Sequence, residues 1–267
     1  MAKNGQQDND SGNKVSEVDI LHSMLRDRDY DTIKEYAKLG GDMLQQNGQG
    51  DKTILHYLVE EGYMELLEHF GDKVTEFEAQ EWVQKDEGSP GTLLGMACER
   101  NTPSLHLVQL LVEKLGVDVN AVYNRQGCLP KLRGGTALHI LASGTHFWQI
   151  RTLEYLLSKG ANIEAKNKDG MTPLLVAINR ESPRGFWSEE MVRVLLRHGA
   201  NANATFEPTK NGAKETGHSA LEMSNHPVIT KLLLEHGANV EHCRGILTNA
   251  IPHEGTWELS SCCWKPE

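Results

Sequence analysis

Residues 136–164 read TALHILASGTHFWQIRTLEYLLSKGANIE, and two short patterns in this stretch decide the fold. The first, Thr136-Ala137-Leu138-His139, is typical of a helix start, because a threonine hydroxyl can accept a hydrogen bond from a backbone N–H that the first turn leaves unpaired. The second, Gly160-Ala161-Asn162-Ile163-Glu164, follows a leucine-rich run with the i, i+3, i+4 apolar spacing of a half-buried helix. Its glycine predicts the end of that helix, since the residue after a helix often has a positive φ that glycine adopts without steric cost.

Both patterns recur along the chain in the same order. Helix starts related to the first pattern begin at four further residues: Thr53, Thr92, Thr172 and Ser219. Closing turns related to the second pattern also begin at four further residues: Gly40, Gly116, Gly199 and Gly237. Self-similarity of this kind, in units of roughly 33 to 45 residues, is the signature of a repeat protein.

The two patterns resemble those of the ankyrin repeat, whose signature reads Thr-Pro-Leu-His-x-Ala and then Gly-Ala-Asp-Val-Asn. The resemblance covers nearly everything from about Val18 to Glu241. It implies an all-α fold, an ankyrin-repeat solenoid of about six helix-turn-helix units with short β-hairpin fingers. It also implies that the signature histidines, His22, His56 and His139, make structural hydrogen bonds to neighbouring repeats and have no catalytic role.

The repeats divide the chain into an array with a segment at each end. We expect residues 1–15 to be a disordered polar tail, because they contain almost no apolar side chain. Residues 243–267 begin a seventh unit and depart from the pattern at Pro252, so we interpret them as a partial or truncated repeat with a C-terminal tail, or as a segment that folds back over the last helix pair. The array itself spans residues 16–242, in units of about 16–49, 50–90, 91–133, 134–168, 169–216 and 217–242.

Composition excludes several classes of protein. No segment approaches the 18 or so uncharged apolar residues that a membrane span needs, so we expect no membrane association. Five irregularly spaced cysteines and a polar N-terminus without a signal-peptide core favour a reducing compartment, the cytoplasm or the nucleus. The net charge of −10 argues against nucleic-acid binding; residues 1–90 carry a net −11 and residues 91–267 a net +1.

Motifs that carry catalysis are missing from the sequence. It contains no Gly-x-x-x-x-Gly-Lys phosphate loop, no Gly-x-Gly-x-x-Gly, no Gly-x-Ser-x-Gly and no His-Glu-x-x-His. We therefore predict no enzyme, no catalytic residue, no cofactor and no small-molecule substrate. A metal-binding or enzyme-associated role is an alternative that depends on one C-terminal cluster, although its spacing lacks the Cys-x2-Cys or His-x3-His pairs of zinc sites: His242, Cys243, His253, Cys262 and Cys263.

Insertions between the units are candidates for partner binding. Residues 121–133 lengthen one finger and carry Arg125, Lys131 and Arg133 without any acidic residue, and residues 204–216 lengthen another. In ankyrin proteins the fingers and inner helices form a concave groove, so by resemblance both loops point at a protein ligand. The alternative is that long surface loops are simply tolerated, since doubling a loop's length costs only about 0.6 kcal/mol.

Two aromatic pairs stand in the same register of adjacent units. Phe147-Trp148 lies in unit four, and Phe186-Trp187 lies in an insertion, residues 180–188, between the helices of unit five. Stacked repeats place such pairs side by side, either as an aromatic anchor for a partner or as an extra layer of core.

The sequence thus predicts a non-enzymatic protein-protein interaction module that acts as an adaptor, scaffold or regulatory subunit through the concave surface. Its partners are one or more proteins. Three alternatives stay open within this class: a transcriptional co-regulator, a ubiquitin-ligase substrate adaptor, and a detached ankyrin module of a larger membrane or signalling protein.

Overall fold

The computed structural model describes residues 20–21, 23–24, 27–39, 53–71, 91–100, 104–124, 132–144, 148–179, 185–206, 209–210, 213–214, 218–224 and 226–240. The predicted disordered tail, the partial seventh repeat, His22 and the C-terminal His/Cys cluster lie outside these residues. Within them, the structure confirms a mostly helical ankyrin-repeat stack.

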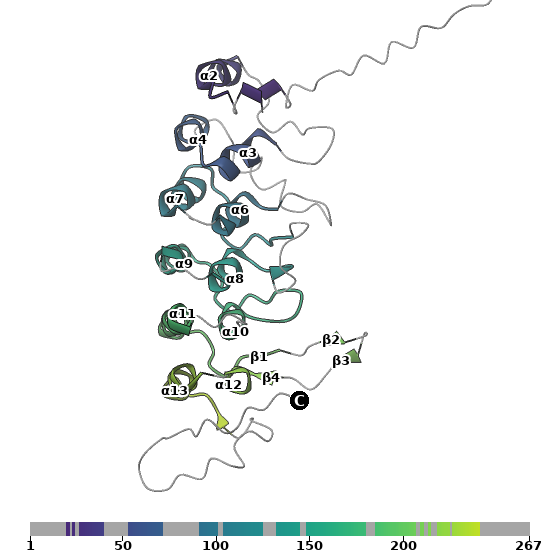
Figure 1. The fold of residues 1–267 in the computed structure, drawn as a ribbon, viewed down its shortest axis with the longest axis vertical. Helices are drawn as coiled ribbons and strands as arrows, with labels where there is room; N and C mark the ends of the chain where they lie inside the picture. The colour runs from purple at the N-terminus through teal and green to yellow at the C-terminus, as the bar shows by residue number, and fades with distance from the viewer. Residues whose placement is uncertain are drawn as a thin grey trace, which may run out of the picture.

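The helices form two columns that run the length of the molecule (Figure 1). The inner column consists of α3 (Ile54–Glu61), α6 (Leu93–Glu99), α8 (Ala137–Ala142), α10 (Pro173–Ile178) and α12 (Ala220–Met223). The outer column consists of α2 (Tyr30–Lys38), α4 (Met64–Gly71), α7 (Leu105–Glu113), α9 (Trp148–Ser158), α11 (Gly185–Arg197) and α13 (Pro227–Glu235). From α3 onward, each helix packs against its partner in the same unit and against a neighbouring helix of its own column, and α2 packs against α4.

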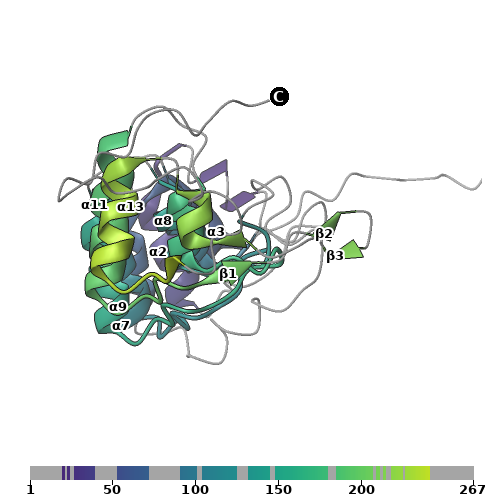
Figure 2. The same cartoon turned by 90° about the horizontal axis from the view of Figure 1, so that it is seen from below.

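Short antiparallel strands project from the inner column, as the predicted hairpin fingers require (Figures 1 and 2). β1 (Thr205–Phe206) pairs with β4 (His218–Ser219), and further out β2 (Thr209–Lys210) pairs with β3 (Ala213–Lys214). A single bridge joins Tyr123 and Gly135 in the preceding lengthened finger.

The helix starts confirm the capping prediction. The hydroxyl oxygens of Thr92 and Ser219 accept hydrogen bonds from the backbone N–H groups of Gly95 and Glu222, at 3.0 and 3.2 Å. At Thr136 the third helical residue completes a reciprocal capping box, because the backbone N–H of Thr136 donates to Nδ1 of His139 at 2.9 Å. Thr53 and His56 repeat this arrangement.

The helix ends agree with the prediction as well, since Gly160, Gly199 and Gly237 have φ values of 88°, 91° and 84°. One boundary was wrong. The insertion predicted at residues 180–188 ends earlier, because α11 begins at Gly185 and includes Phe186 and Trp187. No proline or glycine follows Gly185 in that segment, so nothing stops the helix from extending toward the turn.

One continuous apolar core runs through the stack from Leu21 to Leu233. Every residue of α8 and α10 is buried, and these helices are only six residues long. Helices this short are not stable alone in water, so each depends on its neighbours for burial.

Candidate protein-binding surface

Three consecutive fingers form the candidate surface. We define each finger as the segment from the closing glycine of one unit to the helix start of the next. The third finger comprises residues 116–135, the fourth residues 160–171 and the fifth residues 199–218.

A ladder of polar side chains links the bases of these fingers. Oδ1 of Asn120 accepts a hydrogen bond from the Asn162 N–H at 2.7 Å, and its amide nitrogen donates to the Gly160 carbonyl at 3.3 Å. Asn203 makes the same two contacts one step further along, with the Asn239 N–H at 2.7 Å and the Gly237 carbonyl at 3.0 Å. The ladder therefore holds each finger base at a fixed spacing from the next.

Glu164 takes the equivalent position between these two asparagines. One of its carboxylate oxygens accepts the Asn201 N–H at 2.8 Å. A carboxylate has no proton to donate to the next glycine carbonyl, so this step of the ladder has one hydrogen bond where the others have two.

Asn203→Asp is expected to lower the free energy of unfolding by about 1 kcal/mol, because aspartate keeps the acceptor and loses the donor to the Gly237 carbonyl. Asn162→Asp is the matched control: Asn162 uses Oδ1 only to accept the Glu164 N–H, and Asp118 already fills this place in the third finger. Urea unfolding followed by circular dichroism measures both variants. Equal losses for the two would contradict a role for the donor.

The third finger is anchored by Tyr123. This side chain is fully buried, its hydroxyl donates to Oε2 of Glu99 at 2.5 Å, and its N–H donates to the Gly135 carbonyl at 2.6 Å. A Cβ atom placed on Gly95 would overlap the Tyr123 ring. Gly95 stands at the position where units two and four have His56 and His139, so the tyrosine ring occupies the space beside the helix start that a histidine would need.

The fourth finger is a tight turn around a buried asparagine. Oδ1 of Asn167 accepts the N–H groups of Asp169 and Met171, at 3.0 and 2.8 Å. Nε2 of His139 lies 3.0 Å from the Met171 carbonyl, which ties the turn to the preceding unit. The resemblance predicted such an inter-repeat hydrogen bond for the signature histidine, and His139 makes it.

The fourth finger also contacts the end of the third. The Lys168 N–H donates to the Arg133 carbonyl at 2.9 Å, and the Lys168 side chain lies against Gly134. Arg133 and Lys168 are both exposed. Two basic residues from adjacent units are thus held next to each other.

The fifth finger carries two short strand pairs and projects away from the helices (Figure 2). The ring centroids of Phe206 and His218 lie 6.0 Å apart across the β1–β4 pair. In sequence, Asn211-Gly212 separates β2 from β3, the dipeptide most typical of two-residue hairpin loops. The insertion predicted at residues 204–216 is therefore a hairpin where it is described.

Exposure separates the fingers from the inner helices. In α6, α8 and α10 every residue is buried except Glu99, which is half-buried. Exposed side chains on the fingers include Asn120, Val122, Arg133, Asn162, Lys166, Lys168, Asp169, Asn201, Asn203, Thr205 and His218. Of these two parts of units three to five, the fingers rather than the inner helices therefore present the fully exposed side chains.

Among the predicted partner-binding residues, the structure describes the side chains of Arg133 and Trp148. Arg133 is exposed at the end of the third finger, whereas Arg125 and Lys131 lie outside the described residues. Trp148 begins α9, so it and Arg133 lie beyond opposite ends of α8.

The aromatic pairs are described only in part. Trp148 is half-buried, and its indole nitrogen is shielded from solvent. Phe147 lies outside the described residues, and for Phe186 and Trp187 the structure describes the helical backbone but not the side chains. An interface role for the pairs stays a prediction, beside the alternative that they extend the core.

On the side of the stack away from the fingers, polar pairs between consecutive outer helices join the units. Glu68 pairs with His106 at 3.2 Å, and Glu113 accepts a hydrogen bond from the Tyr155 hydroxyl at 3.0 Å. Burial and the adjacent Glu113 carboxylate raise the pKa of Tyr155 to about 12, so the phenol stays protonated and donates.

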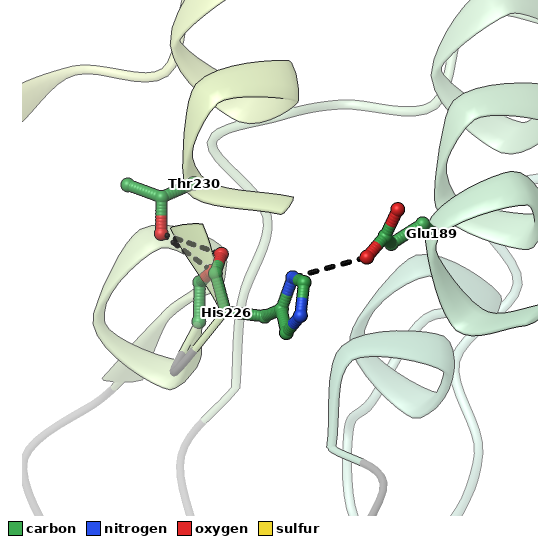
Figure 3. Close-up of polar contacts among 4 residues, drawn as sticks. Glu189, His226 and Thr230 are labelled. Carbon is green, nitrogen blue, oxygen red and sulfur yellow. Dashed lines mark hydrogen bonds and ion pairs between the residues drawn. The ribbon is translucent and has the colours of Figure 1, made fainter. Parts of the chain in front are cut away.

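The last of these pairs joins α11 to α13 (Figure 3). Nδ1 of His226 lies 3.2 Å from Oε1 of Glu189, and the Thr230 hydroxyl donates to the His226 carbonyl at 3.1 Å. His226 is the N-cap of α13, so the pair fixes the start of α13 against α11.

Arg100 is a further link between units that the repeat pattern does not reveal. One of its guanidinium nitrogens donates to the carbonyl of Val59 at 2.9 Å and to that of Glu60, and the other donates to Glu61 at 3.4 Å. These carbonyls belong to the last turn of α3, where a cation is favoured. The arginine of unit three therefore caps a helix of unit two.

The described part of the chain offers little for other kinds of chemistry. It contains no group of three His, Cys, Asp or Glu residues that could hold a metal ion, and none of its helices is long and apolar enough to cross a membrane. Cys98 is fully buried, and this burial raises the pKa of its thiol to about 12. It is therefore a poor nucleophile near neutral pH.

Comparisons with known proteins agree with this geometry. A family model described as "Ankyrin repeats (3 copies)" matches residues 94–206 and residues 149–244, together more than half of the chain. An ankyrin repeat protein of Fowlpox virus (strain NVSL), FPV031, is 26% identical over 203 residues, a match that covers 75% of this chain and 53% of that protein. The chain thus spans about half the length of this relative.

Two solved structures are similar in fold. The ankyrin repeat domain of Bcl-3, described as a unique member of the IkappaB protein family, has a TM-score of 0.54 and 24% identity, over 78% of this chain and 80% of that chain. EF0377, an ankyrin repeat protein, has a TM-score of 0.61 and 19% identity, over 84% of this chain and 100% of that chain. At these identities the likeness concerns the fold alone.

Proposed function

This chain belongs to the ankyrin-repeat family, and from that premise we propose that it is a non-enzymatic protein-binding module that acts as an adaptor, scaffold or regulatory subunit. We also propose that it works in the cytoplasm or nucleus, on the basis of its few, irregularly spaced cysteines. Repeat stacks recognise partners with an extended surface rather than with a pocket.

The observation that supports this function is the exposure pattern of units three to five. The inner helices are buried there, while three consecutive fingers, linked at their bases by Asn120, Glu164 and Asn203, present exposed polar and charged side chains. The backbones that carry this row of side chains are already ordered. Binding a partner therefore does not cost the entropy of ordering them.

The test is affinity capture of the intact chain from cell extract, quantified by mass spectrometry, against a variant in which a Gly-Ser-Gly linker replaces residues 125–131. We expect the shortened finger to lose at least one partner that the intact chain retains. A variant with Lys231→Ala and Glu235→Ala, an exposed pair on α13, is the matched control and is expected to keep all partners. Equal recovery by all three proteins, at equal melting temperature, would contradict a role for this finger.

A further inference from the structure

Several basic residues of the outer column are paired with carboxylates of the same chain. On the outer column Nζ of Lys159 lies 3.0 Å from Oε1 of Glu113, and Nε of Arg193 lies 3.3 Å from Oε2 of Glu190. Lys231 pairs with Glu235 at 3.8 Å in the same way. These cations have an anionic partner already, so they offer little to a second molecule.

The basic residues of the third and fourth fingers differ from these. Arg133, Lys166 and Lys168 are exposed, and within the described part of the chain they make no ion pair. Their backbones are fixed, because the Lys168 N–H donates to the Arg133 carbonyl and the intervening Asn167 side chain holds the turn. We call these three residues the basic finger patch.

Nearby acidic residues do not neutralise the positive charge of the basic finger patch. Glu164 directs one carboxylate oxygen to the Asn201 N–H of the next finger, and Asp169 is the one exposed carboxylate among residues 166–170. In sequence, the third finger adds Arg125 and Lys131, and residues 121–133 contain no acid. The patch is thus locally positive in a chain whose net charge is −10.

From this cluster of exposed cations on a fixed turn we infer that the basic finger patch binds an acidic segment of a protein partner. The inference rests on the proposed protein-binding function and names the chemistry of the partner. Exposed cations that lack an internal partner attract carboxylates and orient an incoming chain, and this effect weakens with salt. We favour a protein segment over nucleic acid. The net charge of −10 repels a long polyanion, whereas a short acidic segment can contact the patch without approaching the acidic parts of the chain.

The test measures fluorescence anisotropy of a labelled 16-residue peptide of alternating glutamate and serine, with a matched peptide in which glutamine replaces glutamate. We expect the acidic peptide to bind the wild-type chain, the neutral peptide to bind at least tenfold more weakly, and affinity to fall as sodium chloride is raised. Arg133→Glu with Lys168→Glu is expected to weaken binding at least tenfold.

The matched control is Lys38→Glu with Lys231→Glu, which changes the net charge equally at two exposed helix positions and is expected to change affinity less than twofold. Equal weakening by the control, no binding of the acidic peptide, or tighter binding of a single-stranded oligonucleotide of the same charge would each overturn the inference. If the peptide fails to bind while shortening residues 125–131 still removes partners from extract, protein binding stands and only the acidic partner is rejected.

Discussion

Gly95→His is expected to lower the free energy of unfolding by about 3 kcal/mol, although it restores the residue that the repeat signature has at this position. In unit four the histidine at the equivalent position, His139, completes a capping box with Thr136. In unit three the Tyr123 ring lies where that histidine would have to go, and even a Cβ atom on Gly95 overlaps it. Overpacking therefore outweighs a cap worth about 1 kcal/mol.

A double variant separates overpacking from any other effect of the histidine. Tyr123→Ala alone should cost about 4 kcal/mol, as for other buried aromatic side chains. Because histidine fills part of the space that the tyrosine vacates, Gly95→His with Tyr123→Ala should cost about the same as Tyr123→Ala alone. Urea midpoints measured by circular dichroism give all three values, and additive losses would show that the two residues do not compete for one space.

Gly95→Ala is the control for helix propensity. Alanine in place of an ordinary helical glycine stabilises a protein by about 1 kcal/mol. Here the added methyl group meets the Tyr123 ring, so we expect a loss of stability. A gain would contradict the packing that the structure gives to this helix.

Helix starts and ends could be predicted from sequence because they depend on neighbouring residues. Thr136 and His139 are three positions apart, and Gly160 ends α9 through its own backbone conformation. The Tyr123 contact joins two positions that are far apart in sequence: the sequence shows only that Gly95 stands where a histidine is typical, and says nothing of what fills the space. Arg100 was missed for the same reason, since its partner Glu60 lies 40 residues earlier.

The candidate site could be predicted only in part, because an insertion reveals a finger only when that finger is longer than usual. Arg133 was identified because its finger is long, whereas Lys166 and Lys168 lie in a finger of ordinary length and were overlooked. Lys166 and Lys168 flank Asn167 in a turn between two units, and such a turn must be exposed. This pattern is the sequence signal that identifies them. The complete burial of α8 and α10 could not be predicted from the sequence either. A six-residue apolar helix is too short for a hydrophobic periodicity that shows which of its faces are covered.

His139→Ala is expected to cost about 3 kcal/mol at pH 8, because it removes a fully buried side chain with partners in two units. Nδ1 accepts the Thr136 N–H, so the ring proton lies on Nε2 and is donated to the Met171 carbonyl. The alanine variant leaves both backbone groups without this partner. His139→Gln should cost about half as much, since glutamine can still accept from Thr136 but is too short to bridge to Met171 in the same way.

The same residue makes stability depend on pH. Burial lowers the pKa of His139 from its ordinary value of 6.5, although hydrogen bonds to the Met171 and Ala165 carbonyls act in the opposite direction. Protonation would place a second N–H on Nδ1, facing the Thr136 N–H that now donates to it. The unfolded chain therefore takes up this proton first, so the contribution of His139 is fully present above about pH 6.5 and is lost as the pH falls toward the depressed pKa of the folded state. Urea midpoints compared at pH 8 and pH 5.5 should fall more for the wild-type chain than for His139→Gln, and parallel pH profiles would exclude His139 as the group responsible.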